Sequence, residues 1–422
     1  MSEPTAAGAG SPRVTVVMPV LNEGKSVEGA IASVLRQSVQ ELELLVVDGN
    51  STDDTAEKVR RIGARDSRVI LLGNPLRTIP AALNIALANA RGEFLARVDG
   101  HASVNDTYLQ LALTRLDEDP TIAAVGGRRI GVAATSGGVA VATALSSKFG
   151  VGDSINHYAD VAQQTDHASF GVFRVSVLRE VGGWDEQLLV NEDVDLDHRI
   201  LQRGHHIWFD PQMSIFWHVR ESVPALARQY RRYGRGKAAM VLKNGRTAVK
   251  VRHLAPPALV VNVGLGAGMI AVGHPRIGLA LLAPYAAALT AATVVTTRSA
   301  EPVQAPPRHD LTVGETVTGS ADTHMPRAAG RTAVAATSGA ATAEGRRANP
   351  LLLVGSFAAM HLGWGLGFLE GALLRLQPAS ASAKIPAVVP AQSARPAADV
   401  PPDGAPDADD EPGDDLARSA IN

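Results

Sequence analysis

Polar side chains of the kinds that bind phosphates, sugars and metal ions follow four apolar runs in the N-terminal half of this sequence. They are Pro19, Asn22 and Glu23 after the first run, Asp48 after the second, Asn74 and Arg77 after the third, and Asp99 after the fourth. In an open parallel sheet, ligands bind beyond the carboxyl ends of the strands. A single acid there is a weak signal, because Asp is common in turns. Four polar strand ends together predict a ligand site.

Asp99 and His101 flank one residue in the segment "LARVDGH". Positions i and i+2 of an extended segment point to the same side, so both side chains can face one ligand. Hard divalent cations prefer carboxylate oxygens, and Mn²⁺ also accepts imidazole. The sequence has no G-x-G-x-x-G after the first strand and no G-x-x-x-x-G-K-[ST], which disfavours a classical dinucleotide or P-loop site. We therefore predict a nucleotide diphosphate held through a cation; an ordinary polar turn is the alternative.

Glu192 and Asp193 form a second group, in "VNEDVDLDHRI". The apolar positions that follow fit a helix, so the acids can be simple capping residues at its positive end. Alternatively, one of them is a general base, which must lie within hydrogen-bond reach of an attacking hydroxyl. The spacing alone leaves both interpretations open. We interpret the nearby His167 as a loop histidine with a satisfied hydrogen bond.

Gln229, Arg232 and Tyr233 form a third group, in "RQYRRYGRGK". Arg can hold a phosphate through two parallel hydrogen bonds, and an aromatic ring beside it can stack on another ring. The alternative is a basic segment that meets anionic lipid. We prefer that alternative for the other basic residues of the segment, which are Arg228, Arg231, Arg235 and Lys237.

The elements that must position these residues alternate between short β-branched runs and longer helical stretches. This alternation is typical of an α/β domain, which we place at residues 13–220. Nearly continuous apolar strands predict a mainly parallel sheet covered by helices on both faces. Ser51 is expected to cap the second helix. The predicted strands are 14–20, 43–48, 68–73, 93–99 and 122–127, and the predicted helices are 26–38, 51–66, 78–90 and 105–119.

The rest of the chain predicts a membrane-bound region. Apolar stretches at 256–273, 277–297 and 351–374 approach the length that spans ~30 Å of hydrocarbon, although buried core helices are the alternative. The basic segment before them favours a cytoplasmic location for the α/β domain, and three spans would place the acidic tail outside. The predicted divisions are a disordered leader (1–12), a basic neck (221–252), two transmembrane helices (256–297), a disordered loop (298–350), a third transmembrane or interfacial helix (351–374) and a disordered tail (375–422).

Composition excludes several other classes of protein. The chain has 422 residues, of which 45% are apolar, and this is ample for a folded core. A net charge of −2 provides no overall field to attract nucleic acid, so we expect no nucleic-acid partner. Because the sequence has no cysteine, it cannot form a disulfide scaffold, a zinc–thiolate site or a thiol nucleophile.

The order of these motifs resembles the inverting family 2 glycosyltransferases with the nucleotide-sugar GT-A fold. The segments that carry the resemblance are "VVMPVLNE", "LLVVDGNSTDDT", "IPAALNIALANARGEFLARVDGH", "GGWDE", "NEDVDLDHRI" and "QYRRY", within about residues 13–250. Within that family, "VDGH", "QYRRYGRGK" and "MHLGWGLGFLEG" resemble the bacterial succinoglycan-type glucosyltransferases of exopolysaccharide assembly.

The resemblance implies a role for each candidate residue. It places Pro19, Asn22 and Glu23 around the nucleotide, and Asp48 and Ser51 near uracil and ribose. It assigns Asp99 and His101 to the family's D-x-D pair, which binds Mn²⁺ or Mg²⁺, although here His replaces the second Asp. Asp193, beside Glu192, matches the catalytic base. Trp184 and Asp185 lie near the acceptor, and Gln229, Arg232 and Tyr233 match the family's Q-x-x-R-W motif with Tyr in place of Trp.

These roles imply transfer of one hexose, with glucose expected, from a UDP-sugar to a polyprenyl-diphosphate-linked saccharide. Asp193 accepts the proton of the attacking hydroxyl, and a single displacement inverts the anomeric carbon to give a β-linkage. The enzyme is expected in the plasma membrane with its catalytic domain in the cytoplasm. The alternatives are a processive polysaccharide synthase and a non-catalytic membrane protein that binds nucleotide sugars or polysaccharide.

Overall fold

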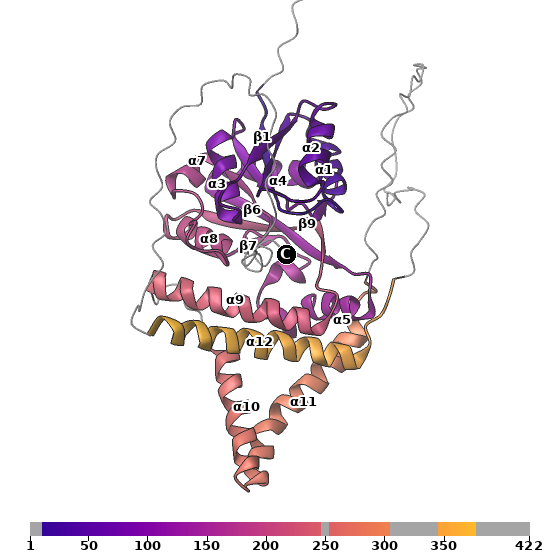
Figure 1. Ribbon diagram of the computed structural model, residues 1–422, viewed down its shortest axis with the longest axis vertical. Coiled ribbons are helices and arrows are strands. Elements are labelled where there is room, and N and C mark those ends of the chain that lie inside the picture. The colour runs from indigo at the N-terminus through magenta and orange to yellow at the C-terminus, as the bar shows by residue number, and fades with distance from the viewer. Residues whose placement is uncertain (1–10, 246–252, 304–344, 377–422) are drawn as a thin grey trace, which may run out of the picture.

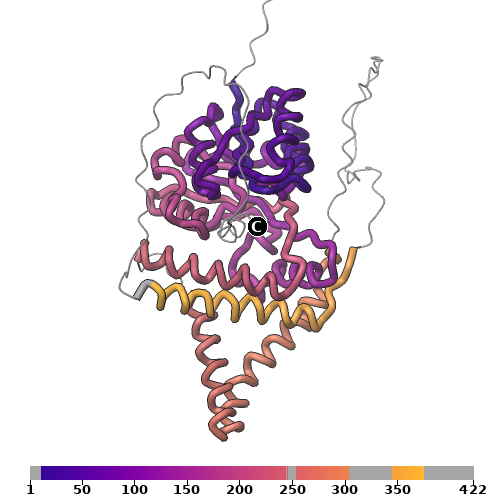
Figure 2. Tube along the Cα trace, viewed as in Figure 1, coloured from indigo at the N-terminus to yellow at the C-terminus, as the bar shows by residue number. Residues whose placement is uncertain are grey.

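The computed structural model describes residues 11–245, 253–303 and 345–376 of the chain. The predicted leader, the end of the basic neck, most of the loop 298–350 and almost all of the tail 375–422 lie outside these ranges. Figures 1 and 2 show an α/β domain above a layer of long helices, with a helical hairpin that projects away from the domain.

The first half of the α/β domain is a parallel sheet with alternating helices, as predicted. The elements are β1 (Val14–Val20), α1 (Val27–Leu35), β2 (Leu42–Asp48), α2 (Thr55–Gly63), β3 (Val69–Gly73), α3 (Ile79–Asn89) and β4 (Phe94–Arg97). Strands β1, β2 and β4 are largely apolar and buried almost throughout, which is typical of a sheet covered on both faces, whereas β3, at the edge of the sheet, is only partly buried.

The second half adds antiparallel strands that the sequence did not predict. The sheet order is β3-β2-β1-β4-β8-β6-β9-β5, with β7 also paired to β9. Strand β8 runs antiparallel between β4 and β6, whereas β6 and β9 are parallel. The elements are β5 (Ala102–Val104), α4 (Tyr108–Glu118), β6 (Ile122–Val132), α5 (Ser136–Leu145), α6 (Lys148–Val151), β7 (Gln163–Thr165), β8 (Val172–Arg174), α7 (Val175–Glu180), α8 (Glu192–Gln202) and β9 (His206–His218).

Two hydrophobic clusters cover the opposite faces of the sheet. One contains apolar residues of α1, α2 and α4, and the other contains those of α3, α7 and α8. Successive residues of β1 divide between the clusters, because side chains alternate across a strand: Val16 and Met18 pack on one face and Val17 on the other. The predicted α/β class, with a mainly parallel sheet between two helical layers, is therefore confirmed.

Two local expectations were wrong. Helix α2 begins at Thr55 with Asp54 at its N-cap, not at Ser51. The Ser51 amide and hydroxyl instead bond to the Asp48 carboxylate, with an Oγ–Oδ1 distance of 2.5 Å, and this turn delays the helix. The fourth strand ends at Arg97, and residues 99–102 form a turn closed by the Ala102 amide and the Asp99 carbonyl at 2.9 Å. Asp99 and His101 are therefore not on an extended segment.

Two long helices lie side by side beneath the α/β domain (Figure 1). They are α9 (Val223–Asn244) and α12 (Pro350–Leu376). Glycines let their backbones approach closely, because a Cβ on Gly367 would collide with the Arg231 carbonyl and one on Gly234 with the Trp364 carbonyl. Glu370 of α12 forms ion pairs with Arg231 and Arg235 of α9. Packing against α12 thus occupies two arginines that we had assigned to lipid.

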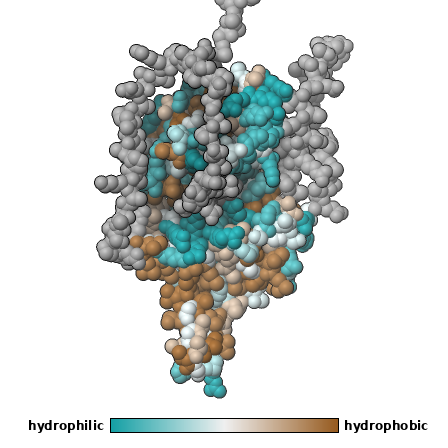
Figure 3. Space-filling view, viewed as in Figure 1, coloured by the Kyte–Doolittle hydropathy of each residue, from teal (hydrophilic) through white to brown (hydrophobic). Residues whose placement is uncertain are grey.

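The hairpin is formed by α10 (Ala255–Ala271) and α11 (Pro275–Ser299). Its surface is largely hydrophobic, whereas the visible face of the α/β domain is mostly hydrophilic (Figure 3). By length and composition, Pro275–Ser299 and Pro350–Leu374 could each cross a membrane, but the 17-residue α10 is shorter than the usual span.

Candidate active site

A cavity of about 620 Å³ lies between the carboxyl ends of the sheet strands and the helices α9 and α12. Of the predicted site residues, the cavity is lined by Asp99, His101, Trp184, Glu192, Asp193, Gln229, Arg232 and Tyr233. Residues from four separate parts of the chain therefore meet at one site. The predicted residues outside the lining are Pro19, Asn22, Glu23, Asp48, Ser51, Arg77 and Asp185.

A hydrogen-bonded network at the ends of β1 and β2 holds several of these remaining residues. The Asn22 amide donates to the Ser51 hydroxyl at 2.9 Å, and the Asn22 side-chain oxygen accepts from the Thr52 amide at 2.8 Å. Asn22 has a φ of 57° and Arg77, at the end of β3, has a φ of 56°. Positive φ is uncommon for residues other than glycine and often marks functional loops. The loops that follow β1, β2 and β3 are therefore held in a defined conformation. We call the group formed by Asn22, Asp48 and Ser51 the ledge.

Arg97 joins two carboxylates of the cavity, and we did not identify it from the sequence. Its Nε lies 2.8 Å from Asp99 Oδ1, and its NH1 lies 3.4 Å from Glu192 Oε1. Burial alone would raise the pKa of Asp99, but the ion pair with Arg97 holds that pKa below its ordinary value. The i, i+2 spacing of Arg97 and Asp99 could have indicated the ion pair between them. No feature of the sequence near Arg97 indicated its contact with Glu192.

His101 is oriented by Glu23, which is itself buried. Its Nδ1 lies 2.8 Å from Glu23 Oε1, while its Nε2 forms no hydrogen bond to any described residue. A neutral imidazole that donates from Nδ1 to a carboxylate presents Nε2 as a metal ligand. No group of three or more His, Asp or Glu residues that could hold a metal occurs among the described residues. Asp99, both of whose oxygens bond to Arg97, and His101 are therefore two candidate ligands, and a bound substrate would have to supply the other ligands of a cation.

Asp193 is the accessible acid of the Glu192–Asp193 pair. Both lie in the first turn of α8, where the helix dipole favours negative charge. The Asp193 side chain is 41% exposed and that of Glu192 only 8%. Because Glu192 is also paired with Arg97, Asp193 is better placed to receive a proton from a ligand in the cavity.

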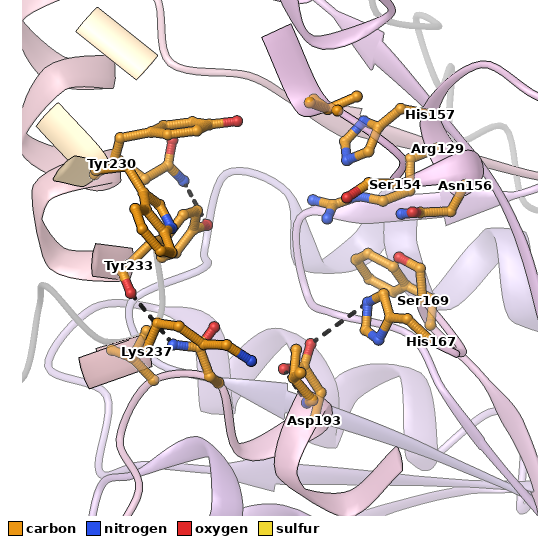
Figure 4. Close-up of a pocket in the computed structure, with 18 of the residues that line it drawn as sticks. Arg129, Ser154, Asn156, His157, His167, Ser169, Asp193, Tyr230, Tyr233 and Lys237 are labelled. Carbon is orange, nitrogen blue, oxygen red and sulfur yellow. Dashed lines mark hydrogen bonds and ion pairs between the residues drawn. The ribbon is translucent and has the colours of Figure 1, made fainter. Parts of the chain in front are cut away.

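His167 connects Asp193 to a buried second acid. Its Nδ1 lies 2.6 Å from Asp197 Oδ2, and its Nε2 lies 4.0 Å from Asp193 Oδ2 (Figure 4). Burial would lower the pKa of His167, but the hydrogen bond to Asp197 raises it above its ordinary value. His167 does have a satisfied hydrogen bond, as expected, but it also lines the cavity. The His167 ring therefore lies between the carboxylates of Asp193 and Asp197.

Burial, together with the charge of Asp193, raises the pKa of Glu192 to about 7. The folded state therefore binds this proton more tightly than the unfolded state. Its stabilising effect is complete below the unfolded pKa and is lost as the pH rises to about 7, so the free energy of unfolding should fall by roughly 3 kcal/mol over that window. Glu192→Gln should flatten this slope in denaturant midpoints measured from pH 4.5 to 8. Glu180→Gln, at an exposed ion pair, is the control, and an unchanged slope in Glu192→Gln would contradict the assignment.

Helix α9 supplies one wall of the cavity. The Gln229 side-chain amide donates to the Tyr233 hydroxyl at 2.9 Å, and the Asn191 side chain, just before α8, donates to the Tyr233 carbonyl at 3.3 Å. Lys237, which we had expected to meet lipid, is buried and lines the cavity, because it lies on the face of α9 that packs towards the domain.

The side chains of Trp184 and Asp185 point in different directions, although the two residues are adjacent in the sequence. Trp184 is buried against Phe173, with ring centroids 6.1 Å apart, and it lines the cavity. Asp185 turns away and pairs with Lys243 near the end of α9. Only Trp184 reaches the cavity.

Two family descriptions match the chain: Glycosyl transferase family 2 at residues 15–182, and Glycosyl transferase family group 2 at residues 99–297. The chain is 36% identical over 261 residues to the succinoglycan biosynthesis protein ExoA of Rhizobium meliloti (strain 1021), covering 60% of this chain and 76% of that protein. It is 22% identical over 241 residues to the poly-beta-1,6-N-acetyl-D-glucosamine synthase of Staphylococcus aureus (strain COL), covering 57% of this chain and 58% of that synthase.

Among solved structures, the chain resembles the mannosyltransferase PcManGT of Pyrobaculum calidifontis, determined in complex with GDP-Man and Mn²⁺. The TM-score is 0.50 at 24% identity, and the alignment covers 68% of this chain and 83% of that one. This likeness confirms the predicted GT-A fold.

Proposed function

We propose that this chain, which belongs to glycosyl transferase family 2, moves one hexose from a UDP-sugar to a lipid-linked saccharide at the plasma membrane. The chain is a glycosyltransferase related to enzymes of exopolysaccharide synthesis. To this family assignment the proposal adds the identity of the donor, the nature of the acceptor and the location at the membrane. Glucose is the expected hexose. It rests on the position of Asp193, an accessible carboxylate in a cavity that extends from the strand ends to α9 and α12.

In this proposal, Asp193 accepts the proton of an acceptor hydroxyl as that oxygen attacks the anomeric carbon of the donor. Attack comes from the face opposite the leaving diphosphate, so an α-linked donor gives a β-linked product. A single base is enough for this one displacement. His167, paired with Asp197, would orient the Asp193 carboxylate towards the acceptor.

The chain's own residues would position the donor. The ledge built on Asn22, Asp48 and Ser51 would hold the nucleoside, with Pro19 and Arg77 at its edges. Arg97 fixes the Asp99 carboxylate, and Glu23 orients His101. Asp99 and His101 would hold Mn²⁺ or Mg²⁺, and that cation supplies charge neutralisation for the departing diphosphate.

The hairpin supports the membrane part of the proposal. Large apolar side chains are exposed on α10 and α11, including Leu265, Ile277 and Leu279, which are 55%, 53% and 59% exposed. We propose that these helices insert into the bilayer, while α9 and α12 lie at its surface. The acceptor saccharide would then enter the cavity from the membrane side, past Met360 and Trp364 of α12.

The test is transfer by membranes containing the full chain, supplied with lipid extract, Mn²⁺ and a panel of UDP-glucose, UDP-galactose, UDP-N-acetylglucosamine and GDP-mannose. Mass spectrometry should show a single hexose added to a lipid-linked product, with UDP-glucose preferred and activity lost after chelation by EDTA. Equal activity with a water-soluble acceptor alone would overturn the lipid part. A series of products that differ by one hexose each would favour a second candidate function, that of a processive synthase. The similarity to the Staphylococcus synthase suggests this candidate.

A further inference from the structure

Arg129 is a cation in the wall of the cavity that forms no direct ion pair with any described residue, although the carboxylates of Asp99 and Asp193 line the same cavity. It lies in the middle of β6, and its guanidinium stacks 4.1 Å from the Trp217 ring and 5.6 Å from the Phe170 ring. No carboxylate lies within 4.0 Å of it among the described residues, and its buried Nε has no hydrogen-bond partner there. Burial lowers the pKa of Arg129, and the charges of Asp193 and Asp99 offset this effect only in part.

Two other arginines near Arg129, Arg97 and Arg128, form ion pairs with carboxylates. Arg97, in the same cavity, is paired with Asp99 and Glu192. Arg128, the preceding residue on β6, is paired with Asp160 at 2.6 Å. The two aromatic rings hold the Arg129 guanidinium in place without neutralising it. This arrangement is a pre-formed anion site, because the fixed fork of Arg matches phosphate oxygens.

The surroundings of Arg129 indicate which anion this is. The nucleoside ledge of Asn22, Asp48 and Ser51 does not line this cavity, whereas Asp99 and His101, which we assign to the donor's cation, do line it. Arg129, Ser154 and His157 lie on one wall, and Tyr233 and Lys237 lie on the opposite wall (Figure 4). Burial and the charge of Arg129 lower the pKa of His157 well below its ordinary value, so this ring is neutral and can donate or accept a hydrogen bond.

The far end of the cavity is apolar and lies against the membrane-proximal helices. Its lining there includes Phe149, Met360 and Trp364. A ligand that fits both ends carries an anionic group next to a hydrophobic chain. A nucleotide sugar lacks such a chain, whereas a polyprenyl-linked acceptor has a diphosphate at the junction of its lipid and its saccharide.

We propose that Arg129 binds the phosphate groups of the lipid-linked acceptor and not the diphosphate of the donor. The proposal rests on the proposed function and deepens it, since it assigns the acceptor's anionic group to a named residue. Lys237, on the opposite wall, would add a second positive charge to the same site. The acceptor would thereby be anchored beside Asp193, with its lipid directed towards α12.

The test compares Arg129→Gln with Arg128→Gln in the purified full chain, using isothermal titration with two probes. Farnesyl diphosphate represents the acceptor's lipid diphosphate, and UDP with Mn²⁺ represents the donor. Arg129→Gln should weaken farnesyl diphosphate binding by about 10- to 100-fold, because it removes a charge-assisted pair of hydrogen bonds. UDP binding should stay within about twofold of wild type, and Arg128→Gln should change neither affinity.

Several outcomes would overturn the proposal. Equal weakening of UDP binding would assign Arg129 to the donor, and unchanged binding of both probes would make it structural. If Arg129→Gln weakens binding to phosphatidylglycerol vesicles as much as it weakens binding to farnesyl diphosphate, Arg129 belongs to a general lipid-headgroup site. Arg129→Lys is the substitute variant if Arg129→Gln does not fold, because it keeps the charge but loses the two parallel N–H donors of the guanidinium. It should weaken farnesyl diphosphate binding about threefold or more.

This experiment also separates the inference from the proposed function. If the wild type transfers hexose but does not bind farnesyl diphosphate, the inference fails and the transferase reaction stands. If the wild type transfers no hexose from any UDP-sugar, the proposed function fails, and the inference about its acceptor fails with it.

Discussion

Asp193→Asn is expected to lower kcat by about 10²- to 10⁴-fold, the contribution typical of a positioned general base. The amide has nearly the shape of the carboxylate but cannot accept the proton of the attacking hydroxyl. UDP-sugar binding should stay within about twofold of wild type, because a base that acts on the acceptor contributes mainly to the transition state. Initial rates with saturating donor, together with titration of UDP, would measure both quantities.

Glu192→Gln is the matched control for this substitution, because it removes the adjacent carboxylate from the same helical turn. Glu192 is buried against Arg97, whereas Asp193 is 41% exposed in the cavity. We expect Glu192→Gln to keep kcat within about tenfold of wild type. Near-normal turnover in Asp193→Asn would remove Asp193 from the mechanism, and an equal loss in both variants would mean that the two acids act as a unit.

Arg97→Gln is expected to destabilise the α/β domain by about 3–5 kcal/mol, because it leaves two buried carboxylates without their shared cation. For a domain of this size, the loss corresponds to a fall in apparent melting temperature of roughly 10 °C. Donor binding should weaken as well, since Arg97 fixes the Asp99 carboxylate at 2.8 Å. Thermal unfolding of the detergent-solubilised chain, with and without UDP and Mn²⁺, would measure both effects.

Arg203→Gln is the control for this loss. Arg203 pairs with Glu180 at 3.4 Å, the same distance as Arg97 and Glu192, but its side chain is 58% exposed. An exposed pair contributes about 0–1 kcal/mol, so the melting temperature should barely move. The double variant Arg97→Gln, Glu192→Gln should recover part of the stability, because it removes one of the uncompensated charges. Equal melting temperatures for Arg97→Gln and Arg203→Gln would contradict the buried-triad interpretation.

Local sequence patterns were enough to predict the first half of the sheet and its helices. Strands β1 to β3 begin and end within one residue of their predicted bounds, because unbroken apolar runs between turn residues specify buried parallel strands. The same patterns predicted that polar residues would gather at the strand ends. The short antiparallel strands β5, β7 and β8 were missed, since each has three residues and is defined by its partner strand.

The sequence by itself therefore determined the α/β class, the family and the chemical types of residue available to the site. Only the tertiary structure decided which of them act together. Arg97 reaches Glu192 across 95 residues of chain, and Glu370 reaches Arg231 across 139. Burial made Asp193 rather than Glu192 the accessible acid, and the fold placed Arg129 in the cavity wall without a direct ion pair to any described residue. Such partnerships depend on distance and solvent exposure in three dimensions, which residue spacing along a chain does not encode.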